Sequence, residues 1–162
     1  MLAEALTALQ NLEPVAALRT SRWVYPLVNT AHIAGLALLV GAIAPLDLRL
    51  LGAWRGVPLH LLARVLQPVA AAGLALAVAA GLAMFAVSAT KYAATPVFLV
   101  KLVLIAAALA NAALLRRHPD WVLARVPGLA AEPGPRLKAA AALSLGLWLA
   151  IILCGRFIAY TA

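Results

Sequence analysis

Residues 65–88 read VLQPVAAAGLALAVAAGLAMFAVS, a stretch that contains no charged side chain. A transmembrane helix needs about 20 mainly apolar residues to cross the hydrocarbon core of a bilayer. This stretch is long enough and apolar enough to do so. It therefore predicts a membrane-spanning α-helix.

Three further stretches have the same character, and they cover residues 23–44, 97–115 and 139–160. The whole chain of 162 residues is 66% hydrophobic and 11% charged, whereas a soluble domain is about half apolar and a quarter charged. A chain this short cannot bury so much apolar surface in one soluble core, so its solvent must itself be apolar. Because the connections between successive spans are short, the sequence predicts an all-α integral membrane protein, an antiparallel four-helix bundle.

Residues 1–21 differ from the four spans. The apolar residues Leu2, Leu6, Leu9 and Leu12 recur at helical spacing, and Pro14 interrupts the pattern. The segment lacks the basic start of a signal peptide. We expect an amphipathic helix at the membrane interface here, separate from the four-span bundle of residues 22–162.

The formal net charge is +8, but the basic residues sit between the apolar runs and form no stripe along a helix. A nucleic-acid partner is therefore not indicated. Most of the basic residues fall in or beside the first and third loops: Arg49, Arg55, Arg64, Arg116, Arg117, Arg125, Arg136 and Lys138. The positive-inside rule then predicts that both loops are cytoplasmic and that both termini lie on the outer side.

Three ionisable residues lie inside the predicted spans: His32, Lys101 and Arg156. At about 1.5 Å per helical residue, His32 lies on the order of 13 Å below the outer end of its span, and the two cations lie nearer that surface. Polar groups in hydrocarbon are costly, so those that occur are expected to be functional. The alternatives are that both cations snorkel to the headgroups, and that His32 hydrogen-bonds Asn29 or a neighbouring helix.

Several residues on the same helix faces extend this set. Asn29 shares a face with His32, Trp148 lies two turns from Arg156, and Met84 follows small residues at four-residue spacing in the second span: Gly73, Ala77 and Gly81. These small residues are also the type that packs helices closely in lipid.

An imidazole is a common axial ligand of haem iron, and cations can pair with haem propionates. The set predicts a haem b site with His32 on the iron, Met84 or Lys101 as second ligand, and Lys101 and Arg156 near the propionates.

Three segments carry a resemblance to a known group of proteins: WVYPLVNTAHIAGLALLVGAIAPLDLRLLG, FLVKLVLIAAALANAAL and LWLAIILCGRFIAY. The chain resembles a family of uncharacterised bacterial four-span inner-membrane proteins, a domain of unknown function. Its layout is similar to the CopD copper-resistance and HemJ protoporphyrinogen oxidase groups. In the HemJ-like groups a first-span histidine and a later lysine are associated with haem, which implies His32 and Lys101 here. The chain lacks the paired intramembrane histidines of di-haem cytochromes.

The leading hypothesis is a haem b-binding membrane protein or oxidoreductase subunit that transfers electrons near the outer face of the bacterial inner (cytoplasmic) membrane. A cofactor-free accessory or scaffold subunit and a CopD-like metal transporter remain open. Besides the lipid bilayer, two partners remain as alternatives: a second copy of the chain and a larger membrane complex. Pro45 is expected to end the first span, and Asp47 and Arg49 are expected to pair where it leaves the membrane.

Overall fold

The computed structural model describes residues 1–126 and 132–161, so residues 127–131 of the predicted third loop lie outside the described part. Within these described residues, four long helices form the bundle: α3 (Val24–Leu51), α4 (Leu59–Val87), α6 (Pro96–Arg117) and α8 (Pro135–Thr161). Each of them is long and apolar enough to cross a membrane. The predicted all-α four-helix bundle is confirmed, and the chain is a multi-pass membrane protein.

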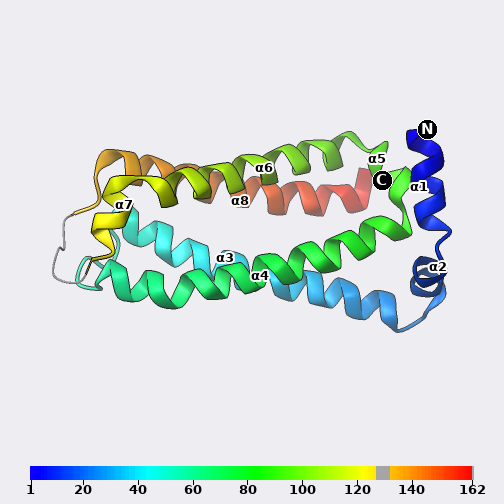
Figure 1. Ribbon diagram of the computed structural model, residues 1–162, viewed down its shortest axis with the longest axis horizontal. Helices are drawn as coiled ribbons and strands as arrows, with labels where there is room; N and C mark the ends of the chain where they lie inside the picture. The colour runs from blue at the N-terminus through cyan, green and yellow to red at the C-terminus, as the bar shows by residue number, and fades with distance from the viewer. Residues whose placement is uncertain (127–131, 162) are drawn as a thin grey trace.

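The four helices form two antiparallel pairs, α3 with α4 and α6 with α8 (Figure 1). The pairs join mainly through α3 and α8. Short helices lie at the two ends of the bundle: α1 (Leu2–Gln10), α2 (Glu13–Thr20) and α5 (Ala89–Ala93) at one, and α7 (Pro119–Ala124) at the other. We call these ends the α5 end and the α7 end.

The helix α3 continues past Pro45, where the sequence predicted the first span to end. A proline inside a helix removes one backbone hydrogen bond, and membrane helices tolerate this where neighbouring groups compensate. The helix stops instead at Gly52, which has a φ of +111°. The Gly52 and Ala53 amides donate to the carbonyls of Arg49 and Leu48, a helix end that requires a left-handed residue and so favours glycine.

Two clusters of buried residues lie in the part of the bundle that the structure describes. One lies at the α7 end and contains Leu50, Leu59, Ala63, Trp121, Leu137 and Ala141. The other lies nearer the middle of the bundle and contains Leu39, Ala108, Trp148 and Ile151. Because α3, α6 and α8 all contribute to the middle cluster, it ties the two helix pairs together.

Close contact between α3 and α4 depends on their glycines. A Cβ atom on Gly35 would lie 2.5 Å from the Ala77 amide nitrogen, and one on Gly73 would lie 2.5 Å from the Leu39 amide nitrogen. Real Cβ atoms do not approach backbone so closely, so any larger residue would force the helices apart. The stripe of small residues thus packs two backbones together, as in other membrane helix pairs.

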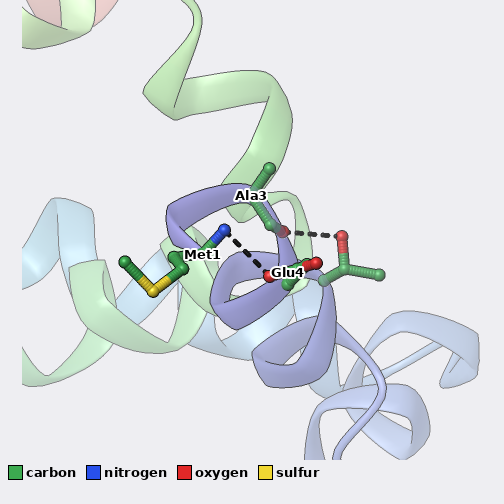
Figure 2. Close-up of polar contacts among 4 residues, drawn as sticks. Met1, Ala3 and Glu4 are labelled. Atoms are coloured by element: carbon green, nitrogen blue, oxygen red, sulfur yellow. Dashed lines mark hydrogen bonds and ion pairs between the residues drawn. The ribbon is translucent and has the colours of Figure 1, made fainter.

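The N-terminal segment forms two helices, α1 and α2, rather than the single helix expected. The Met1 amino group pairs with the Glu4 carboxylate at 2.8 Å, and the Thr7 hydroxyl donates to the Ala3 carbonyl at 2.9 Å (Figure 2). At the other end of α1, the Gln10 amide donates to the Val87 carbonyl. Both short helices therefore lie against the α5 end of the bundle (Figure 1).

Candidate functional site

His32 on α3 is held by a hydrogen bond to the neighbouring helix. Its Nδ1 atom lies 2.7 Å from the carbonyl oxygen of Ala77 on α4. A carbonyl oxygen only accepts, so Nδ1 carries the hydrogen and donates it. In the neutral ring, the lone pair available to a ligand is then on Nε2. Of the two hydrogen-bonding alternatives, the structure therefore shows the neighbouring helix rather than Asn29 as the partner.

Gly81 makes room for the His32 ring on α4. A Cβ atom at position 81 would lie 3.1 Å from Cε1 of His32 and 3.3 Å from its Nδ1. These distances are shorter than ordinary van der Waals contact. The small-residue stripe of α4 therefore has a second use, since Ala77 supplies the hydrogen-bond acceptor and Gly81 supplies the space.

Lys101 lies on α6 where it faces α8. Its Nζ atom is 3.5 Å from the position that a Cβ atom of Gly155 would take, and Cys154 of α8 lies within electrostatic range of it. Lys101 also lies within electrostatic range of His32. Of the predicted site residues, His32 and Lys101 therefore lie within electrostatic range of each other, although they belong to different helix pairs.

The remaining predicted residues are more scattered. Arg156 is exposed and donates to the Tyr160 hydroxyl at 2.6 Å, with its guanidinium 4.9 Å from the centre of the same ring. Asn29 is exposed, and Met84 is partly buried one turn beyond Gly81 on α4. Trp148 packs with Leu39 in the middle cluster, about two turns along the bundle from His32.

Two polar groups that the sequence linked to each other have other neighbours. Asp47 is buried, with 4% of its surface exposed, and the Ser144 hydroxyl of α8 donates a hydrogen bond to its carboxyl group. Arg49 donates instead to the carbonyl oxygens of Val57 at 2.8 Å and Arg55 at 3.1 Å. The predicted Asp47–Arg49 ion pair does not form, because Arg49 holds the connection between α3 and α4.

An aromatic cluster closes the α5 end. The Tyr92 ring lies 5.6 Å from that of Phe98 and 6.5 Å from that of Phe85, and its hydroxyl is hydrogen-bonded with Tyr25. Burial raises the pKa of Tyr92, and the neighbouring Tyr25 phenol adds to the rise. The cluster joins α3, α4, α5 and α6, and it keeps the Tyr92 phenol neutral.

Comparison with family models, curated proteins and solved structures finds no match to this chain. The chemistry of the residues above is therefore the basis for any assignment. A histidine bound to a metal almost always donates its other ring N–H to a carbonyl, a carboxylate or water. His32 already makes such a donation with Nδ1, so its Nε2 atom has the tautomer that a metal ligand needs.

Proposed function

We propose that this chain is a haem b-binding membrane protein or subunit that transfers electrons, with Nε2 of His32 as an axial ligand. The observation that supports this most directly is the hydrogen bond from Nδ1 to the Ala77 carbonyl. Such a bond selects the tautomer with a free Nε2, orients the ring and raises its basicity. Haem, when bound, supplies the one-electron redox chemistry.

Lys101 is the residue we propose to act with His32. It is partly buried and lies within electrostatic range of the imidazole, so its amine can serve as second ligand or pair with a propionate. Met84 is the alternative second ligand. Arg156 remains a partner for a propionate from its exposed position, whereas buried Trp148 and exposed Asn29 receive no role in the proposed site.

We propose the bacterial inner membrane as the location, with the α5 end outside and both termini on that side. The support is the charge distribution, because the arginine-rich loops between α3 and α4 and between α6 and α8 both lie at the α7 end. The positive-inside rule places such loops in the cytoplasm. The proposed haem then lies in the outer half of the bilayer.

The packing of α3 on α4 bears on the scaffold alternative. Gly35 and Gly73 are buried within the chain, each against the backbone of the other helix. They are consequently unavailable as a docking surface for another membrane subunit. The small-residue stripe between α3 and α4 therefore gives no support to a scaffold role.

The visible absorption spectrum of the purified protein tests the proposal. Protein from haem-replete cells should carry a Soret band, and His32→Ala should lose most of it because the axial ligand is gone. His60→Ala is the matched control, since His60 lies on the first turn of α4 at the α7 end, and it should keep the band. No Soret band in the wild type, or the same band in His32→Ala, would refute the proposal.

A further inference from the structure

A groove between α3 and α8 lies away from His32 and Lys101. It encloses about 270 Å³ and is lined by Val40, Ile43 and Ala44 of α3 and by Leu145 and Trp148 of α8, among others. The lining residues Leu149 and Ile152 are 59% and 41% exposed. Since α8 is a membrane-spanning helix, the groove opens toward lipid, and its volume is several times the ~30 Å³ that one water molecule occupies in the liquid.

A polar pair lies one helical turn beyond this groove toward the α7 end. Asp47 follows Ala44 by one turn on α3, and Ser144 precedes Trp148 by one turn on α8. The Ser144 hydroxyl donates to the Asp47 carboxyl group, so the pair joins the same two helices that form the groove. The Oδ2 atom of Asp47 is buried and has no hydrogen-bond partner.

An unpartnered buried carboxyl oxygen is rare in folded proteins, because polar groups removed from water are nearly always hydrogen-bonded. The group that satisfies it in either protonation state is a hydroxyl, which both donates and accepts. The groove wall contributes an indole ring, which favours an aromatic ligand packed against it. The rest of the lining is aliphatic and suits a hydrocarbon tail.

We propose that the groove and the Asp47–Ser144 pair form a binding site for a lipid-soluble quinol. One ring hydroxyl bonds Oδ2 of Asp47, the ring packs against Trp148, and the tail passes over Leu149 and Ile152 into the bilayer. Because Oδ2 is shielded from the surface, binding includes a small shift of the side chains between the groove and the carboxyl group.

This site is separate from the proposed haem site. Asp47 and His32 are both on α3, and the helical rise places them on the order of 22 Å apart along its axis. The quinol proposal rests on Asp47, Ser144 and the groove and does not depend on haem. His32→Ala should therefore leave quinol binding unchanged, so that a failure of one proposal is distinguishable from a failure of the other.

A titration of the full chain in lipid nanodiscs tests the site. The probe is a benzoquinol with a decyl tail, added under argon, and the readout is quenching of tryptophan fluorescence. The wild type should show saturable quenching, and Trp148→Phe should lose most of the saturable signal because that indole lies against the ring. Asp47→Leu should weaken binding about tenfold or more through loss of the hydroxyl contact.

The matched control is the same compound with both hydroxyls methylated. It has the same tail but no hydroxyl donor, so it should bind the wild type about as weakly as the quinol binds Asp47→Leu. This comparison uses only wild-type protein and stands even if Asp47→Leu fails to fold. Equal binding of the quinol and its dimethyl ether would show a site for hydrocarbon tails only and would overturn the proposal, as would quenching that does not saturate.

Discussion

At the scale of single residues, the sequence predicted that His32 lies too deep in its span to reach the headgroups. It could not identify the partner, because that partner is the backbone carbonyl of Ala77, and every residue has a carbonyl. Asp47 shows the same limit. The orphan oxygen of its buried carboxyl is the kind of feature that costs about 1–3 kcal/mol, and it depends on how α3 and α8 face each other.

Gly81→Ala tests whether the position of the imidazole matters. The new Cβ would lie 3.1 Å from Cε1 of His32, so the ring must move and its hydrogen bond to Ala77 must weaken. We expect a folded protein with reduced haem content, measured as Soret absorbance per protein. Gly146→Ala is the control, since nothing lies within 4 Å of a Cβ there. Equal haem content in both variants would contradict the role given to Gly81.

Tyr92 provides a prediction about pH. Its pKa is raised above the ordinary 10.0 by burial and by Tyr25, so the folded protein disfavours the tyrosinate. This contribution to stability is complete below pH 10.0 and is lost as the pH rises through the raised pKa. An ultraviolet titration should show one phenol that ionises at a higher pH than an ordinary tyrosine. This high-pH step should be absent in Tyr92→Phe and retained in Tyr160→Phe. A high-pH step that persists in Tyr92→Phe would contradict the assignment to Tyr92.

At the scale of helices, hydropathy predicted where spans exist but not where helices end. The predicted first span ended at Pro45, whereas α3 continues to Leu51 because the left-handed Gly52 provides the stop. The sequence also predicted that small residues would be at helix contacts. It could not predict that Gly35 faces Gly73 and Ala77, because alanine-rich helices offer several such faces and tertiary packing selects one.

Glycine substitutions measure the α3–α4 contact. Gly73→Ala places a Cβ 2.5 Å from the Leu39 amide nitrogen, an overpacking that should cost on the order of 1–3 kcal/mol of unfolding free energy. Gly41→Ala on α3 has nothing within 4 Å and should be neutral or stabilising, since alanine favours helices over glycine. Denaturant unfolding in mixed micelles compares the two. Similar stabilities would contradict the close contact.

At the scale of the whole molecule, composition alone predicted four crossings, and the described helices confirm them. The pairing of the two halves through α3 and α8 was not predictable, because four apolar helices with short connections permit more than one arrangement. This arrangement leaves His32 and Lys101, which come from different pairs, within electrostatic range of each other, and it places Trp148 in the middle cluster.

Orientation in the membrane can be tested with single cysteines in a Cys154→Ser background. Ala8→Cys lies on α1 at the α5 end and Arg125→Cys lies beyond α7 at the other end. If the arginine-rich loops are cytoplasmic, a membrane-impermeant maleimide should label position 8 in intact spheroplasts. Position 125 should react only after lysis. The reverse pattern would contradict the proposed orientation.

Replacement of the proposed ligand by free imidazole tests whether haem iron binds Nε2 of His32. His32→Gly removes the side chain and leaves a cavity beside Ala77 and Gly81. We expect that the purified variant lacks the wild-type Soret band and that added imidazole restores it, because free imidazole can take the place of the missing side chain. A wild-type band in His32→Gly without imidazole would show that His32 is not the ligand. An unchanged spectrum when imidazole is added to the haem-supplied variant would show the same.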